Sequence, residues 1–176
     1  MLNFKKNKRK LIIAEIGQGH RNSLKEAKKL IDLTASAGAD IIKFQTHYAE
    51  AESTYDEKFR KGFKFKHKTR FDYWKSCEFT KNEWRELKTY SNKKKLIFTS
   101  SPFSEKAFFI LKSIGVNLWK IGSGEFLDIF LIKKIMKFKK DIIFSTGMCE
   151  ENEIDYMYKR LLKLKSKKQK VSLMNC

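Results

Sequence analysis

Cysteine is scarce in this sequence, and no cysteine belongs to a recognisable motif. The three cysteines are widely spaced, at Cys77, Cys149 and Cys176. Their odd number does not indicate a disulfide framework, and no C-x-x-C pair or Cys/His cluster indicates a zinc site. Three isolated histidines add no metal-binding motif. We therefore expect reduced thiols in a cytoplasmic protein.

Long apolar runs are also missing, so no segment of the sequence has the length needed to span a bilayer. The first ten residues are basic, but no signal-type apolar stretch follows them. Residues 11–16 are too few for such a stretch and are interrupted by Glu15. We predict a cytoplasmic protein without a membrane partner.

Acidic residues are few, because 20 Asp and Glu stand against 39 Lys and Arg, for a formal net charge of +19. Such a charge is compatible with nucleic acid or anionic lipid as a partner. The lysines are nevertheless scattered, with only short runs at residues 93–95 and 165–170. We expect a solvated lysine-rich surface and no nucleic-acid partner. A non-enzymatic basic protein that binds nucleic acid stays open as an alternative.

The chain does have a clear alternation of strands and helices, and hydrophobic residues make up 41% of it, enough for one domain with a core. The apolar patterns predict strands at residues 11–17, 39–45, 95–101, 117–121, 141–144 and 171–175. Helices are expected between them, with Ser23, Thr80 and Ser104 as N-caps, and the one over residues 71–91 possibly in two pieces. Residues 46–70 interrupt the rhythm and predict an inserted loop or hairpin.

This alternation fits either an open doubly wound sheet or a (β/α)8 TIM-type barrel. No G-x-G-x-x-G follows the first strand, which weakens the dinucleotide-binding version of the open sheet. Polar residues follow nearly every strand, and a barrel gathers all its strand ends around one mouth. We predict an incomplete barrel with about six β/α units.

The candidate site residues stand at these strand ends. They are Glu15; Lys43 and Gln45; Ser100 and Ser101; Lys120, Ser123 and Glu125; and Ser145 and Thr146. Lysines and hydroxyls suit a phosphate or carboxylate ligand. The carboxylates of Glu15 and Glu125 suit a hydroxyl-bearing second substrate or proton transfer.

Other interpretations of the same residues remain open. Lys43 fits a structural ion pair with a glutamate, and Ser101 and Ser145 fit simple turn or cap chemistry. Lys43 or Lys120 also fits a Schiff-base lysine of a class I aldolase. His47 follows the second strand at a place from which it can face the site.

An ordered set of motifs resembles the N-terminal barrel of the N-acetylneuraminate (sialic acid) synthase family. The matching stretches are IAEIGQ at 13–18, AGAD at 37–40, KFQT at 43–46, YWK at 73–75, EFT at 78–80, SSPFS at 100–104, WKIGSGE at 119–125 and STGM at 145–148. They run in the family's order over nearly the whole chain. Each one is weak alone, and the ordered set is strong.

The resemblance implies a condensation of phosphoenolpyruvate with an open-chain N-acetyl amino sugar, giving a nonulosonic acid and phosphate. It implies that Lys43, Ser101, Lys120, Ser123 and Ser145 bind phosphoenolpyruvate, that Gln45 and Glu125 contact the sugar, and that Glu15 lies by the reacting carbons. Glu15 and Glu125 are thus the candidate catalytic residues. In the full-length family it also implies a divalent metal, typically manganese, and a homodimer.

The chain departs from the family pattern in sequence and in length. GHRN at 19–22 replaces a common Asn-His-Asn-Gly, Asp141 replaces a proline and Asn175 a histidine. Family members continue through further strands that carry the metal-binding histidines, and then to an antifreeze-like domain. We therefore expect a fragment or truncated product, inactive as a synthase by itself. Which acylated sugar is used depends most on residues 46–70.

Overall fold

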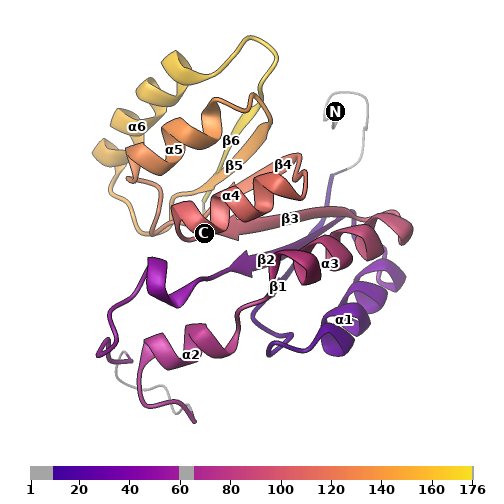
Figure 1. The fold of residues 1–176 in the computed structure, drawn as a ribbon. Coiled ribbons are helices and arrows are strands. Elements are labelled where there is room, and N and C mark those ends of the chain that lie inside the picture. The colour runs from indigo at the N-terminus through magenta and orange to yellow at the C-terminus, as the bar shows by residue number, and fades with distance from the viewer. Residues whose placement is uncertain (1–9, 60–65, 176) are drawn as a thin grey trace.

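The computed structural model describes residues 10–59 and 66–175, where parallel strands alternate with helices (Figure 1). The strands are β1 (Ile13–Gly17), β2 (Ile41–Thr46), β3 (Ile97–Pro102), β4 (Leu118–Ile121), β5 (Asp141–Ser145) and β6 (Val171–Met174). The helices are α1 (Leu24–Ser36), α2 (Arg70–Ser76), α3 (Lys81–Lys93), α4 (Glu105–Ser113), α5 (Ile129–Met136) and α6 (Glu151–Leu164), with a short 3-10 helix η1 (Ala49–Ala51).

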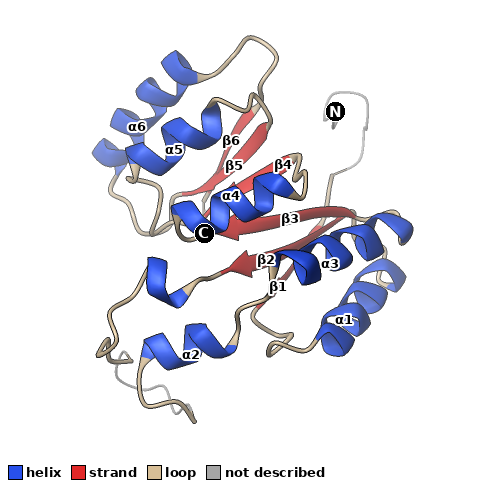
Figure 2. Cartoon of the chain, viewed as in Figure 1, coloured by secondary structure: helices blue, strands red, loops and turns tan. Residues whose placement is uncertain are grey.

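The strands form two parallel sheets, in the orders β1-β2-β3 and β4-β5-β6. Strands β3 and β4 lie side by side, and the Thr99 hydroxyl donates to the Leu118 carbonyl across them at 2.7 Å. The larger helices lie outside the strands (Figure 2). This is the TIM-barrel-like α/β arrangement that the sequence predicts.

Alternation along each strand separates the two faces of the sheet, as the two-residue period of a strand requires. In β2, Ile42 and Phe44 belong to the large core beneath the helices, whereas Ile41 packs in a second, smaller cluster with Leu118 and Ile143. Lys43 and Gln45 share the face of Ile41 and line a cavity further along the strands. The smaller cluster is therefore an apolar layer on the side of the strands that carries the polar residues.

Local capping fixes where the helices begin and end, largely where the sequence predicts. Ser23, Thr80 and Ser104 each accept a hydrogen bond from the backbone three residues on, and Thr80 completes a capping box with Glu83. Gly38, with φ of 76°, follows the C-cap of α1 in the left-handed conformation that glycine adopts without cost. The helical stretch expected at 71–91 is indeed two helices, α2 and α3.

The first strand differs from its prediction. The sequence predicts a strand buried on both faces from residue 11, but β1 begins at Ile13 and is only partly buried, and Ile12 is 57% exposed. Among the described residues β1 pairs with β2 alone, so its other edge is open.

The inserted segment between β2 and α2 also differs from one of its two predicted forms. Its described parts, 47–59 and 66–69, contain η1 and turns, and no strand. The insertion is therefore a loop with one short helix where it is described. Most of the Phe-Lys alternation that favours a hairpin lies at residues 60–65, outside the described residues.

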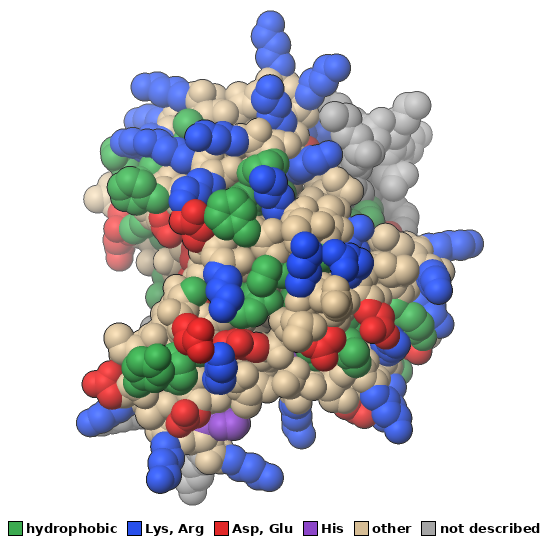
Figure 3. All heavy atoms as spheres, viewed as in Figure 1, with side chains coloured by type: hydrophobic (Ala, Val, Ile, Leu, Met, Phe, Trp, Pro, Cys, Tyr) green, Lys and Arg blue, Asp and Glu red, His purple; other side chains and the backbone are tan. Residues whose placement is uncertain are grey.

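The basic residues are dispersed over the surface. On the face shown in Figure 3, lysine and arginine side chains are spread around the whole outline, with acidic side chains among them. Several lysines have a carboxylate partner, such as Lys94 with Asp32 at 2.6 Å and Lys75 with Glu50 at 2.9 Å. Separately, no helix in the described ranges combines the length and the apolar character that crossing a bilayer requires.

His20 is a buried titratable group within the large core. Its side chain is 0% exposed and its ring stacks on Phe79 with centroids 4.5 Å apart. The backbone N–H of Asn22 donates to Nδ1 at 3.1 Å, so the neutral ring carries its proton on Nε2. Burial, with a smaller contribution from His47, lowers the pKa of His20 from 6.5 to about 4.

This burial predicts that acid destabilises the fold through His20. Between about pH 4 and pH 6.5 the unfolded chain binds a proton on His20 that the folded chain does not, so stability rises with pH across this window. As the pH rises through this window, we expect the free energy of unfolding of the wild type to increase by roughly 3 kcal/mol relative to that of the His20→Phe variant. Urea unfolding at several pH values measures the difference. The partly exposed His67, changed to Phe, is the control, and parallel curves for wild type and His20→Phe would contradict the prediction.

Candidate active site

A cavity of about 500 Å³ opens at the carboxyl ends of β2 to β5. Among its lining residues are Lys43, Gln45, Ser101, Lys120, Ser123, Glu125 and Ser145, which are all of the predicted site residues except Glu15, Ser100 and Thr146. Ser100 turns away from it, because its hydroxyl lies 2.7 Å from that of Thr46 in the buried wall. The strand topology thus brings together side chains that lie up to a hundred residues apart in sequence.

A second cavity, of about 570 Å³, lies at the opposite ends of the strands. Its lining includes Lys88, Lys139 and Lys140 but no hydroxyl side chain and no glutamate. In parallel α/β barrels the amino-terminal ends of the strands serve stability, whereas chemistry takes place at the carboxyl ends. We therefore assign the candidate site to the cavity that holds the predicted residues.

Lys43 is held by a partner on the neighbouring strand. Glu15 and Lys43 stand directly opposite each other in the β1–β2 register and their side chains form an ion pair. The lysine side chain is 11% exposed, whereas that of Glu15 is 47% exposed. The structural ion pair considered from the sequence is therefore formed, and it holds the ammonium group at the edge of the cavity.

Lys120 is buried at the floor of the cavity, with 4% of its surface exposed. Its ammonium group donates to the Ile121 carbonyl at 2.9 Å and to the Ser145 hydroxyl at the end of β5. A lysine so deep in the fold is rare without such partners. Ser145 is thus placed beside a cation, where its own proton is available to an anionic ligand.

The loop after β4 is a tight turn held by two backbone hydrogen bonds and by the buried Phe126 ring. Backbone N–H groups of Glu125 and Phe126 donate to the carbonyls of Gly122 and Ser123 at 3.2 and 3.3 Å. The Phe126 ring is fully buried and packs against Phe144, with centroids 5.7 Å apart. This anchor holds the turn from which Ser123 and Glu125, on either side of Gly124, both line the cavity.

Glu125 is the most perturbed carboxyl group of the site. Burial, and after it the nearby charges of Glu52 and Asp128, raises the pKa of Glu125 from 4.5 to about 7. Its Oε2 is buried and has no hydrogen-bond partner. The carboxyl group lies so close over Gly122 that a Cβ there would overlap Oε2, so a larger residue at position 122 would displace the Glu125 carboxyl group. A carboxyl that titrates near neutrality is suited to give and take a proton.

The opposite wall of the cavity comes from the insertion, α2 and the residue that follows β3. It is formed by His47, Glu52, Glu57, Arg70, Trp74 and Phe103. Arg70 pairs with Glu57, and its guanidinium carbon lies 5.8 Å from the centre of a Trp74 ring. Of this wall, sequence reasoning anticipates only that His47 can face the site. Trp74 lies within one of the recognised motifs, YWK, and that was the signal available for it.

The described residues do not supply a metal site. Within residues 10–59 and 66–175, no three His, Cys, Asp or Glu side chains gather as ligands for one ion. His47 and Glu52 are engaged with each other, and no third ligand joins them. The manganese that the family resemblance implies stays a prediction, and no step below depends on it.

Parallel strands with outer helices and a polar cavity at the strand carboxyl ends define a TIM-barrel-type protein. The family model described as NeuB matches residues 30–176, and the chain therefore belongs to the NeuB family.

Relatives with named activities agree with this assignment. The chain is 34% identical over 174 residues to the N,N'-diacetyllegionaminic acid synthase of Campylobacter jejuni, covering 96% of this chain and 52% of that one. It is 32% identical to the human N-acetylneuraminate-9-phosphate synthase, covering 84% and 42%. A crystal structure of N-acetylneuraminic acid synthetase from Leptospira borgpetersenii serovar Hardjo-bovis superimposes with a TM-score of 0.79 at 32% identity, covering 94% and 53%. The chain thus spans about half the length of these relatives.

The raised pKa of Glu125 predicts a stability cost at neutral pH. As the pH rises from 4.5 to 7, the unfolded chain loses the Glu125 proton while the folded chain retains it, so stability falls with rising pH. From pH 4.5 to pH 7.5 we expect the free energy of unfolding of Glu125→Gln to increase by roughly 2 kcal/mol relative to that of the wild type, allowing for partial exposure. Urea unfolding at both pH values measures this.

The control for Glu125→Gln is Asp155→Asn, which removes an exposed carboxylate from α6. Its stability difference from the wild type should not widen in favour of the variant over the same range. A Glu125→Gln variant that stays at a constant offset from the wild type would mean that Glu125 ionises at its ordinary pH in the fold.

Proposed function

We propose that this chain forms the phosphoenolpyruvate-binding end, and part of the sugar-binding end, of a nonulosonic acid synthase active site. The observation that carries the proposal is the convergence of two lysines, three serines, an amide and a near-neutral carboxyl group on one cavity. The synthase names of the relatives support it. The full activity belongs to proteins about twice the length of this chain.

The anionic substrate occupies the end of the cavity that the strands build. Phosphoenolpyruvate carries a phosphate and a carboxylate, and Lys43 and Lys120 supply one cation from β2 and one from β4. The hydroxyls of Ser101, Ser123 and Ser145 donate to the same oxygens. Because Lys120 is already desolvated and held by protein atoms, it binds an anion without losing further hydration.

The acylated amino sugar occupies the other end. Gln45 lies opposite Ser101 in the β2–β3 register. The proposed sugar and anion ends are therefore adjacent at these two residues. The unpartnered Oε2 of Glu125 is available to a sugar hydroxyl or to the aldehyde oxygen. Mono- and di-N-acetylated sugars both match this chemistry, as the names of the relatives suggest.

The proposed reaction forms one carbon–carbon bond. The methylene carbon of phosphoenolpyruvate attacks the aldehyde carbon, and the aldehyde oxygen takes a proton, which protonated Glu125 supplies. Water adds to the former enol carbon and gives one proton to Glu15. The new hydroxyl then forms the ketone as the carbon–oxygen bond to phosphate breaks, and its proton leaves with the phosphate. Glu125 suits the acid role because its raised pKa keeps a proton on it near neutral pH. A divalent metal and a homodimeric assembly are further parts of this proposal.

Loss of the buried cation should weaken anion binding. We expect Lys120→Met, which keeps the side-chain length and the apolar stem, to weaken phosphoenolpyruvate binding by the purified chain about 10- to 100-fold. Isothermal titration calorimetry measures this. Lys159→Met, which removes an exposed lysine of α6 and the same net charge, is the matched control and should bind as the wild type does.

A borohydride experiment on the wild-type chain distinguishes this proposal from a Schiff-base aldolase. Borohydride treatment with pyruvate should leave the mass of the wild-type chain unchanged, because both cavity lysines serve as cations and not as nucleophiles. A stable adduct on Lys43 or Lys120, or equal phosphoenolpyruvate affinity in wild type and Lys120→Met, would contradict the proposed function.

A further inference from the structure

The His47 side chain is enclosed in the wall of the cavity between two aromatic rings. Its ring lies flat between Trp74, with centroids 3.8 Å apart and planes 9° apart, and Phe103, at 4.1 Å and 15°. The side chain is only 4% exposed. Because both faces of the imidazole are covered, only its edge, with the two nitrogens, is left for polar contacts.

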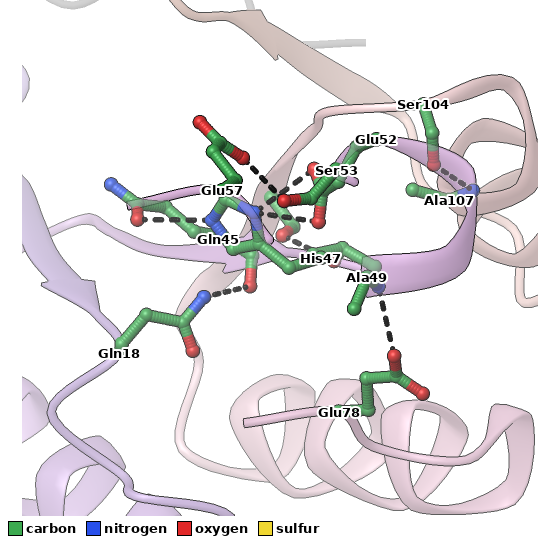
Figure 4. Close-up of polar contacts among 12 residues, drawn as sticks. Gln18, Gln45, His47, Ala49, Glu52, Ser53, Glu57, Glu78, Ser104 and Ala107 are labelled. Carbon is green, nitrogen blue, oxygen red and sulfur yellow. Dashed lines mark hydrogen bonds and ion pairs between the residues drawn. The ribbon is translucent and has the colours of Figure 1, made fainter. Parts of the chain in front are cut away.

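Each nitrogen of this edge has its own partner. Nδ1 lies 3.0 and 3.1 Å from the two carboxylate oxygens of Glu52, and Nε2 lies 3.5 Å from Oε1 of Gln45 (Figure 4). A carboxylate and an amide oxygen both only accept hydrogen bonds, so this arrangement requires two ring protons: one on Nδ1, donated to Glu52, and one on Nε2, donated to Oε1 of Gln45. The contact of Nε2 with Oε1 turns the amide nitrogen of Gln45 away from the ring, as Figure 4 shows.

The elements that carry these groups are tied together independently of the His47 contacts. The backbone N–H of Ala49 in η1 donates to Glu78 at 2.9 Å, and the Tyr48 hydroxyl donates to the Phe79 carbonyl at 2.7 Å. Glu50 pairs with Lys75 of α2 at 2.9 Å. These contacts hold Glu52 at the edge of the His47 ring and Trp74 on one of its faces, so both are positioned without help from the imidazole.

We propose that His47 is a positioning residue for Gln45: held by Glu52 and the two rings, it turns the Gln45 amide nitrogen into the cavity as a donor for an acceptor oxygen of the amino sugar. This inference rests on the proposed function, in which Gln45 contacts the sugar. It extends the site by two residues that act through a third. It also assigns Gln45 a direction, because the amide donates to the sugar and does not accept from it.

The sequence offers a direct spectroscopic test, since the chain contains three glutamines, Gln18, Gln45 and Gln169, and three histidines. Selective 15N labelling of glutamine gives three side-chain amide signals, and labelling of histidine reports the proton on each ring nitrogen. We expect both ring nitrogens of His47 to carry a proton. The Gln45 amide signal should shift in His47→Asn, while that of Gln169, near the opposite ends of the strands, stays unchanged.

Two substitutions separate the two edges of the ring. Asparagine at position 47 retains a donor near the place of Nδ1, toward Glu52, whereas glutamine retains one near the place of Nε2, toward Gln45. We expect His47→Asn to weaken binding of N-acetylmannosamine, measured by saturation-transfer NMR with phosphoenolpyruvate present, by at least about tenfold. His47→Gln should recover part of this loss. Phosphoenolpyruvate affinity should change less than about twofold in both.

The outcomes distinguish this inference from the proposed function. An unprotonated Nδ1 or Nε2, a Gln45 signal insensitive to His47→Asn, or unchanged sugar binding in that variant would overturn the positioning role. A wild-type chain that binds phosphoenolpyruvate but not the sugar would overturn it as well, while leaving the anion end standing. Failure of the wild type to bind phosphoenolpyruvate would instead contradict the proposed function, and the labelled Gln45 and His47 signals would still decide whether the two side chains are coupled.

A purely structural role for His47 predicts a different pattern. The His47→Phe variant keeps a flat ring between Trp74 and Phe103 but has no nitrogen. If stacking alone mattered, this variant would bind the sugar as the wild type does, and the positioning role would be wrong. We expect it to unfold near the wild-type temperature and to lose sugar binding to the same extent as His47→Asn.

Discussion

The two-residue period of the parallel strands is the constraint on which the site depends. In β2 it sends Ile42 and Phe44 under the helices and leaves Ile41, Lys43 and Gln45 on the other face. Because neighbouring strands keep register, Glu15 meets Lys43 and Gln45 meets Ser101 without any loop having to place them. A shift of one residue would move the charged groups into the apolar core, so the fold and the site are specified by the same pattern.

Two titratable groups make the stability of the fold depend on pH in opposite directions. His20 is buried neutral in the core, which favours folding at higher pH, whereas Glu125 retains its proton in the cavity, which favours folding at lower pH. The two effects occupy overlapping pH ranges and partly cancel in the wild type. The carboxyl group that costs stability is the one whose Oε2 faces the cavity without a partner, as expected where a group is kept for a ligand.

Most of what the strands place was accessible from the sequence. The apolar runs, caps and strand-end residues such as Lys120 and Ser145 follow local rules, and local rules located them. The stacking of Trp74 and Phe103 on His47 could not be predicted from the sequence, because the two residues come from different elements and meet only in the fold. The partial burial of β1 was missed for a similar reason, since an apolar run such as residues 11–16 does not reveal how many neighbours its strand has.

The cavity is therefore built by two different devices. The end proposed for the anion rests on strand register and on the turn anchored by Phe126. The end proposed for the sugar is built by η1, α2 and the described part of the loop between them, joined by contacts such as those of Glu57 with Arg70 and of Glu78 with the backbone N–H of Ala49. A loop wall can change in length and side chains without disturbing strand register. An invariant anion and a variable sugar would be accommodated by this division.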